Sequence, residues 1–391
     1  MRLSRLRKAA VTVVAALASA ALASLALFAA VELRPGLAVT FGLVKIRYYA
    51  LKWADYRPDP VLVFDRRQPP PLRGKFPGDL YLPEYGPAQP FDYSATYTPD
   101  GFRANSSRPP YEVVVVGDSF VEAGSDDSLT LSERLRARTG LPALNLGRSW
   151  YGPPQYVEVL RRYGLPHRPR VALLCFFSGN DAEDAAEYER WSRGGDYYFY
   201  KDLSSMSFPR RYLLAASDAA AYARWALGRR AAHFRRDARL RLAVVRTEAG
   251  ETPMAFNNWG KAAPADELLA SPEWRLVGQS FAAFRDLCRA AGARPVVVYV
   301  PRKEEVYAGL AAESSGEDFK TARDRFLPFA DAPGRAARRL AEEAGLEFID
   351  LLPEFRRRAG EGRLLFHPFD THWNRDGIDL AAELIAPSLR R

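Results

Sequence analysis

From Tyr111 onward, hydrophobic residues fall in short continuous runs that alternate with amphipathic stretches. The runs are YEVVVVG, PALNLG, RVALLCFF, RPVVVYV and LEFID, a pattern typical of strands buried on both faces of a sheet. The stretches between and after them, such as SPEWRLVGQSFAAFRDLCRAAG and NRDGIDLAAELIAPSL, have helical spacing. This alternation predicts an α/β fold with a parallel five-stranded sheet and helices on both faces.

The N-terminal pattern is different. A basic segment, MRLSRLRK, precedes an uncharged run from Ala9 to Val31 that is rich in alanine and leucine. A helix needs about 20 apolar residues to span a bilayer, and a signal peptide has a shorter apolar region. We therefore expect residues 1–33 to be an uncleaved membrane anchor with its basic end inside, although a cleaved signal stays an alternative. Either reading places the rest of the chain outside the cytoplasm, which in a Gram-negative cell is the periplasm.

Two further regions complete the predicted domain organisation. Residues 34–110 form a linker segment whose proline-rich part, RRQPPPLRGKFPGDLYLPEYGPAQP, is typical of an extended spacer. Residues 111–391 form the α/β domain, with an insertion at about residues 182–270 that is too long for a plain connection. The insertion contains an arginine-rich amphipathic stretch, residues 212–246. It is either a lid or partner surface, or a solvated elaboration without a role.

Composition excludes several classes of function. The net charge is +9, but only eight of the 56 basic residues are lysine, and neither a nucleic-acid recognition motif nor a basic tail is present. Cys175 and Cys288 lie in apolar or helical surroundings, as small buried hydrophobic residues do. The two cysteines and four histidines show no metal-ligand spacing. We therefore expect no nucleic acid, metal or cofactor.

Polar residues and glycines follow three of the predicted strands at the point where each strand ends. The first run stops at Gly117 and is followed by Asp118 and Ser119. The second ends in NLGRSWYG, with Gly147 at the turn, and the third ends in FFSGND, which contains Asn180. Open α/β sheets place their chemistry at the carboxyl edge, so we expect these residues to meet there.

Together with two residues near the C-terminus, these positions fit acyl transfer. The hydroxyl of Ser119 needs a base to become a nucleophile, and His372 is the candidate. Asp370 is placed to orient the His372 ring and stabilise its imidazolium. The tetrahedral intermediate needs an oxyanion hole, for which the N–H groups of Ser119 and Gly147 and the amide of Asn180 are the candidate donors.

The motifs GDS, NLG, GND and DTH together resemble the SGNH (GDSL) hydrolase superfamily over about residues 111–389. The resemblance implies a three-layer α/β/α, flavodoxin-like fold, with Ser119 as nucleophile, Gly147 and Asn180 in the oxyanion hole, and His372 as base. The common family pattern is Asp-x-x-His, whereas one residue separates Asp370 from His372 here. The string DTHWN instead resembles the branch of periplasmic alginate O-acetyltransferases. In that branch the Asp-x-His usually precedes the serine, while here it follows.

Further residues are candidates for the site. The segment VPRKEEVY resembles another part of the acetyltransferase branch, so Lys303 and Tyr307 are expected to line the site. Asp118 either braces its turn or contacts substrate. Trp373 either stacks on a sugar ring or fills the core. His367 has no acid at a suitable spacing and is expected to be structural.

We therefore expect a membrane-anchored, extracytoplasmic serine enzyme that acts on O-acetyl esters, most plausibly of a glycan. Water as acceptor would make it an esterase, and a sugar hydroxyl would make it a polysaccharide O-acetyltransferase with a membrane acyl-donor protein as partner. A second class is a catalytically inactive glycan-binding or assembly factor. The complete set of serine, glycine, asparagine, aspartate and histidine argues against that class.

Overall fold

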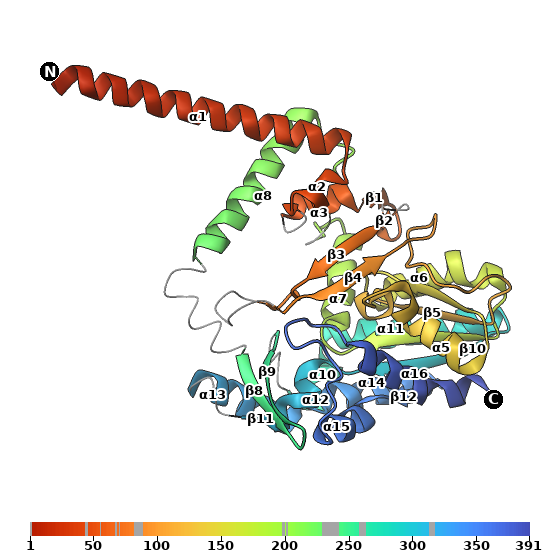
Figure 1. Ribbon diagram of the computed structural model, residues 1–391. Helices are drawn as coiled ribbons and strands as arrows, with labels where there is room; N and C mark the ends of the chain where they lie inside the picture. Colours follow the sequence, from red (N-terminus) through yellow and green to blue (C-terminus); the bar gives the residue numbers. More distant parts are fainter. Residues whose placement is uncertain are drawn as a thin grey trace. The chain divides into compact units, whose positions relative to one another are not determined.

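A five-stranded parallel sheet forms the centre of the α/β part of the chain in the computed structural model, with the strand order β12-β10-β7-β5-β6 (Figure 1). The strands are β5 (Val113–Gly117), β6 (Ala143–Gly147), β7 (Val171–Phe177), β10 (Arg294–Val300) and β12 (Glu347–Asp350). Each of the five apolar runs identified in the sequence forms one of them. The predicted parallel sheet is therefore confirmed.

The strand register brings the predicted motifs to one edge. Val113 pairs with Val171 of β7 and with Ala143 of β6, and Gly117 pairs with Gly147 where β5 and β6 end. Every residue of β5 and β7 is buried, as expected for strands covered on both faces. The residues that follow β5 and β6 consequently start at the same level of the sheet.

Helices cover the sheet in a three-layer α/β/α arrangement, which confirms the expected fold. Helix α11 (Pro272–Ala290) packs against α6 (Pro153–Val159) and α7 (Asp181–Ser192), whereas α16 (Arg375–Leu389) packs against α5 (Leu131–Thr139). Phe176 of β7 contacts Trp274 and Phe281 of α11, with ring centroids 5.6 and 5.7 Å apart. The helices of this part are α5 (Leu131–Thr139), α6 (Pro153–Val159), α7 (Asp181–Ser192), α11 (Pro272–Ala290), α14 (Ala332–Glu343), α15 (Leu352–Gly360) and α16 (Arg375–Leu389).

The structure describes residues 2–43, 46–54, 56–66, 69, 71–81, 89–197, 200, 202–228, 242–257, 263–312 and 317–391. The chain divides into two compact units, residues 1–58 with 201–230 and residues 59–200 with 231–391. Part of the arginine-rich stretch of the insertion, residues 229–241, lies outside the described residues. Its helical part, α8 (Phe208–Gly228), falls in the first unit.

Most of the linker segment belongs to the same unit as the sheet. Its strands are β1 (Tyr56–Asp59), β2 (Val63–Arg66), β3 (Leu72–Phe76) and β4 (Phe91–Ala95), with β3 antiparallel to β4. Arg66, 4% exposed, forms an ion pair of 2.7 Å with the buried Glu122 and donates to the Gly101 carbonyl. Where it is described, the segment is thus folded rather than an extended spacer, because buried polar contacts tie it to the α/β body.

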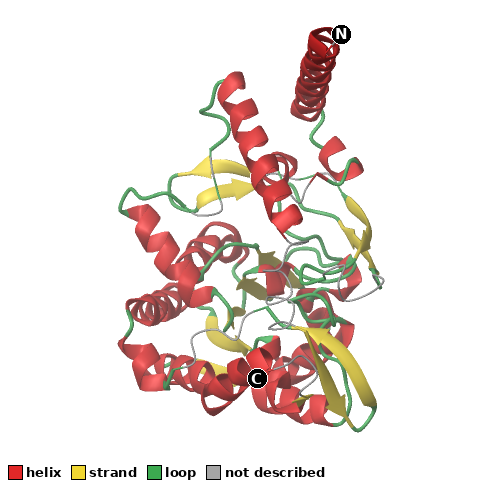
Figure 2. Cartoon of the chain, turned by 90° about the vertical axis from the view of Figure 1, so that its left-hand side faces the viewer, coloured by secondary structure: helices red, strands yellow, loops and turns green. Residues whose placement is uncertain are grey.

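A small antiparallel sheet lies within and after the insertion, with the order β11-β8-β9. Its strands are β8 (Leu242–Thr247), β9 (Gly250–Ala255) and β11 (Ala311–Ala312), shown with the other strands in Figure 2. Further helices of the same unit are α10 (Ala265–Ala270), α12 (Lys303–Tyr307) and α13 (Glu317–Phe326). The backbone of Ala255, at the end of β9, donates to the Pro368 carbonyl at 2.8 Å, so this sheet supports the segment that carries His372.

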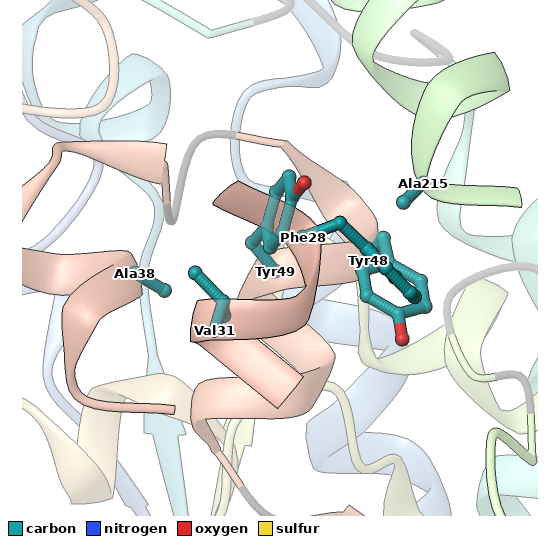
Figure 3. Close-up of a cluster of buried hydrophobic side chains, with 6 residues drawn as sticks. All are labelled: Phe28, Val31, Ala38, Tyr48, Tyr49 and Ala215. Atoms are coloured by element: carbon teal, nitrogen blue, oxygen red, sulfur yellow. The ribbon is translucent and has the colours of Figure 1, made fainter. Parts of the chain in front are cut away.

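The first unit is built around α1 (Arg2–Leu33) together with α2 (Leu37–Thr40), α3 (Arg47–Trp53) and α8. Residues 10–33 of α1 have a mean hydropathy of 2.3 and are long enough to cross a membrane. A helix of this kind near an N-terminus serves either as an anchor or as a signal sequence. The end of α1 packs into a buried cluster that Figure 3 shows, made of Phe28, Val31, Ala38, Tyr48, Tyr49 and Ala215.

Candidate active site

Ser119 begins a short helix, α4 (Ser119–Glu122), directly after β5. Asp118 caps this helix by accepting the Phe120 N–H at 2.9 Å, and it also accepts the Ser119 hydroxyl at 3.3 Å. Asp118 and Phe120 are buried, whereas Ser119 is partly exposed. The turn therefore presents the serine at the carboxyl edge of the sheet, with its N–H in the first turn of a helix, where no intrahelical acceptor exists. Asp118 braces the turn.

Gly147 allows α4 to pack closely on the end of β6. A Cβ atom at this position would lie 2.3 Å from the Glu122 nitrogen, so no other residue fits without a shift. The Gly147 N–H donates to Asn145 Oδ1 at 2.9 Å, and the Asn145 amide donates to the Val121 carbonyl. The Gly147 N–H, which we expected in the oxyanion hole, therefore already donates to Asn145. Its role in catalysis stays a prediction.

Asn180 stands at the N-terminus of α7, at the end of the neighbouring strand β7. Its amide donates to Asp184 Oδ2 at 2.5 Å, which uses one of the two hydrogens on Nδ2. Burial raises the pKa of Asp184 and of Asp181, whose carboxylate accepts the Phe177 N–H and the Tyr156 hydroxyl. Asn180 therefore both supports a buried acid and retains a donor for an oxyanion, and the second role stays a prediction.

Asp370 and His372 lie on a tight loop that precedes α16. The loop is closed by a bridge between Phe366 and Trp373. Nδ1 of His372 lies 2.8 Å from Oδ1 of Asp370, which also accepts the backbone N–H of His372 at 2.9 Å. The cap of α16 is Asn374, which accepts the Gly377 N–H, so Asp370 is not engaged in capping.

The electrostatics of this pair favour an imidazolium beside a carboxylate. Burial lowers the pKa of His372, but the charge and hydrogen bond of Asp370, with smaller effects of Asp79 and Asp118, raise it to about 9. Burial disfavours ionised Asp370, yet the charge and hydrogen bonds of His372 hold the pKa of this carboxyl below its usual range. The side chain of His372 is 27% exposed and that of Asp370 is 4% exposed, so solvent screens the interaction between the two charges only moderately.

Asp79, from the linker segment, joins this pair and was not identified from the sequence. Its backbone N–H donates to Asp370 Oδ2 at 2.9 Å, and its carboxylate accepts the Thr371 N–H at 2.7 Å. Ligand atoms of Asp79, Asp370 and His372 lie within 4.8 Å of one another, a spacing that could also hold a cation. Because N–H groups already occupy both oxygens of Asp370 and one of Asp79, we interpret the cluster as a hydrogen-bonded acid–base group. In the sequence, the local signal at Asp79 is the tripeptide PGD, which is typical of a turn.

Lys303 and Tyr307, on α12, contact the backbone of the segment that leads to and carries Asp370, and a role for either in lining the site stays a prediction. Lys303 is 2% exposed, and its ammonium donates to the carbonyls of His367 at 2.8 Å, Ala255 at 3.1 Å and Asp370. Burial lowers its pKa to about 8. The Tyr307 hydroxyl donates to the Arg363 carbonyl and accepts the Leu365 N–H. Both residues thus hold the backbone that carries Asp370 and His372.

Three aromatic side chains near the carboxyl edge of the sheet differ in their exposure and contacts. Trp373 is 1% exposed and its ring lies 5.3 Å from that of Phe120, so it fills the core rather than offering a sugar platform. His367 stacks on Phe91 at 3.9 Å, and burial lowers its pKa to about 4, which fits a structural role. Trp150, 38% exposed, follows β6 with φ of 71°, an uncommon backbone conformation for a bulky residue.

Trp150 follows a residue that bonds to α4, the helix that carries Ser119. Trp150 was not identified from the sequence. The neighbouring Ser149 donates both its N–H, at 2.8 Å, and its hydroxyl, at 2.7 Å, to Glu122 of α4. Tyr197 donates to the Trp150 carbonyl at 2.8 Å. The position of Trp150 three residues after Gly147, at a predicted strand end, was the available signal.

The described residues contain no hydrogen bond between Ser119 and His372. Phe120, the residue after Ser119, has its ring 5.1 Å from the imidazole of His372. Catalytic hydrogen bonds are often long in an empty site and tighten when substrate binds. A serine at a helix start, a histidine paired with a buried carboxylate, and nearby N–H and amide donors together form a constellation suited to acyl transfer.

Comparisons with known proteins show what this chain is similar to. Residues 256–391 match the family model described as "SGNH hydrolase-like domain, acetyltransferase AlgX", which confirms the resemblance found in the sequence. No curated protein matches the chain. Among solved structures, an extracellular lipase from Streptomyces rimosus is similar at 16% identity and a TM-score of 0.38, over 72% of this chain and 98% of that chain. A putative SGNH hydrolase from Slackia heliotrinireducens is similar at 12% identity and a TM-score of 0.35, over 71% and 98%.

Proposed function

We propose that this chain, whose residues 256–391 match an SGNH hydrolase-like domain family, is a serine enzyme that acts on O-acetylated glycans as a hydrolase or an acetyltransferase. The observation that carries the proposal is the bond of 2.8 Å between His372 and Asp370, near the partly exposed Ser119. It leaves Nε2 of His372 to take the serine proton. Ser119 is the nucleophile, His372 the base and Asp370 the residue that orients the base.

The proposed reaction has two halves. The Ser119 Oγ attacks the acetyl carbonyl carbon while its proton passes to Nε2 of His372. The tetrahedral intermediate, its oxyanion stabilised by the N–H of Ser119 and the amide of Asn180, expels the donor oxygen, which takes the proton from His372. Acetyl-Ser119 is then attacked by an acceptor hydroxyl, whose proton passes to His372 and returns to Ser119. Water as acceptor gives acetate, and a sugar hydroxyl gives a new ester.

The match of residues 256–391 to an acetyltransferase family supports transfer to a sugar as a specific second candidate. Product analysis separates the two outcomes. The purified protein is incubated with a chromogenic acetyl ester in the presence and absence of a glycan oligosaccharide. Free acetate as the sole acyl product indicates an esterase, whereas an acetylated oligosaccharide indicates a transferase. Absence of both products with folded protein would contradict an enzymatic function on acetyl esters.

We also propose that α1 stays attached as a membrane anchor and that the catalytic part is extracytoplasmic. The end of α1 supports this proposal, because Phe28 and Val31 are fully buried in the first unit. Glu32 accepts the Tyr48 hydroxyl at 2.5 Å and pairs with Arg211 at 2.8 Å. Cleavage directly after the apolar run, which ends at Val31, would remove Phe28 and Val31 from this cluster. Mass spectrometry of the mature N-terminus, from washed membranes, tests this; a mature protein that begins within or after the apolar run, residues 9–31, would contradict it.

A further inference from the structure

The linker segment reaches the acid–base pair through reciprocal backbone contacts. Residues Gly78 to Leu80 run beside residues Phe369 to Thr371, and the Leu80 N–H donates to the Phe369 carbonyl at 3.0 Å. Gly78 has φ of 99°, and a Cβ atom there would lie 1.9 Å from the Phe369 carbonyl oxygen, so the approach requires glycine. This close packing places Asp79 opposite the loop residues that connect Asp370 to His372.

We propose that Asp79 is a positioning residue of the active site, which fixes the Asp370–His372 pair and stabilises the imidazolium formed during acyl transfer. Its N–H holds Oδ2 of Asp370, while its carboxylate holds the Thr371 N–H between the two catalytic residues. Asp370 is thereby held from two sides, by His372 on Oδ1 and by Asp79 on Oδ2. The inference rests on the proposed role of His372 as the base.

The charge of Asp79 acts on His372 together with the other groups that face this ring. The titratable and charged groups that interact with the ring are Asp370, Asp79, Asp118 and His367, and Lys303 lies behind Asp370. Asp79 and Asp118 both act in the same direction as Asp370, since each carboxylate favours a protonated ring. Burial raises the pKa of Asp118 to about 6, and burial together with the charge of Asp370 raises the pKa of Asp79. Asp79 differs from Asp118 in its geometry, because it bonds directly to Asp370 and to the Thr371 N–H.

Asp79→Asn is the informative variant, because asparagine still accepts from the Thr371 N–H and the backbone contact to Asp370 is unchanged. Only the negative charge is lost. Removing a full charge within about 5 Å should lower the pKa of His372 by between about 0.5 and 2 units. The same shift should appear in the acid limb of the pH profile of kcat/KM for an acetyl ester.

Nuclear magnetic resonance titration of His372 gives a readout that does not depend on turnover. Wild type, Asp79→Asn and Asp92→Asn are titrated in parallel. Asp92 is a matched control on β4 whose side chain is 86% exposed and pairs only weakly with Lys75 at 3.2 Å. We expect a downward shift of the His372 midpoint in Asp79→Asn and none in Asp92→Asn. The titration tests the role of Asp79 even in a protein without esterase activity. A lack of esterase activity would contradict the proposed function alone.

Asp79→Ala separates charge from anchoring, since it removes both the charge and the acceptor for Thr371. We expect it to lower kcat further than Asp79→Asn, with the melting temperature measured to establish that the variant folds. An unchanged His372 midpoint in folded Asp79→Asn would overturn the proposal, even if Asp79→Ala were inactive. Asp79 would then be a structural anchor of the loop only.

Discussion

Oδ1 of Asp370 accepts two hydrogen bonds from His372, one from the ring at 2.8 Å and one from the backbone at 2.9 Å. A spacing of one intervening residue therefore suffices for a carboxylate to reach Nδ1, provided that the segment is a tight loop. The bridge between Phe366 and Trp373 closes that loop. The departure from the usual Asp-x-x-His pattern does not prevent an acid–base pair from forming.

The pKa of His372 sets an expectation for the pH dependence. A folded-state pKa of about 9, above the ordinary value of about 6.5, means that the ring is protonated and unable to accept a proton at neutral pH. We expect kcat/KM for an acetyl ester to rise with pH and to reach half its maximum at about pH 9. The same shift stabilises the folded state fully below about pH 6.5, and this contribution disappears as pH rises through 9. An acid limb at or below pH 6.5 would contradict the assignment.

Asp370→Asn tests orientation of the base. Asparagine keeps the shape of the side chain but cannot stabilise an imidazolium, and it favours the wrong tautomer. Serine triads lose up to ~10⁴-fold in turnover through this change. The matched control is Asn374→Ala, which removes the cap of α16 and should cost about 1 kcal/mol of stability with a much smaller effect on turnover. Near-normal turnover in Asp370→Asn would show that His372 works as the base without this carboxylate.

Asn180→Ala tests the oxyanion hole. Loss of one donor costs ~3 kcal/mol of transition-state stabilisation, so kcat should fall by about 10²- to 10³-fold while KM changes little. The variant also removes the partner of Asp184, so its melting temperature should decrease. A variant that loses stability but keeps its kcat would assign Asn180 to support of the buried acid alone.

Trp150 is the exposed aromatic side chain beside the serine helix, and we expect it to contact the sugar ring of the substrate. A bulky residue with positive φ is a strained feature of the kind that clusters at functional sites. Trp150→Ala should raise KM for an acetylated oligosaccharide at least about fivefold, since an aromatic contact contributes ~1 kcal/mol. Kinetics with a small chromogenic acetate, which lacks the sugar, should be unchanged. Equal effects on both substrates would argue against a sugar contact.

The sequence predicted the sheet well because each central strand is a continuous apolar run. The four valines of β5 and the seven apolar residues of β7 can be satisfied only by burial on both faces. Strand ends then placed Ser119, Gly147 and Asn180 on one edge. Asp370 and His372 were found through their local spacing.

The strands of the linker segment could not be predicted from the sequence, because they lack a periodic pattern of apolar residues. β3 is almost entirely exposed, and β2 is held by the buried ion pair of Arg66 with Glu122, 56 residues away. Asp79 meets Asp370 across 291 residues, a contact that no local pattern encodes. Trp373 and Trp150 also could not be ranked from sequence, since an aromatic residue after a strand or before a helix fits both a core and a binding surface.

The proposed mechanism requires that Ser119 becomes acetylated with His372 as its base. Intact-mass spectrometry after brief incubation with an acetyl ester, followed by peptide mapping, tests it most directly, with Ser119→Ala and His372→Ala as comparison variants. We expect one acetyl group on Ser119 in the wild type, none at this position in Ser119→Ala, and much slower labelling in His372→Ala. Folded wild-type protein that turns over the ester without acetylation of Ser119, or with equal labelling in His372→Ala, would contradict it.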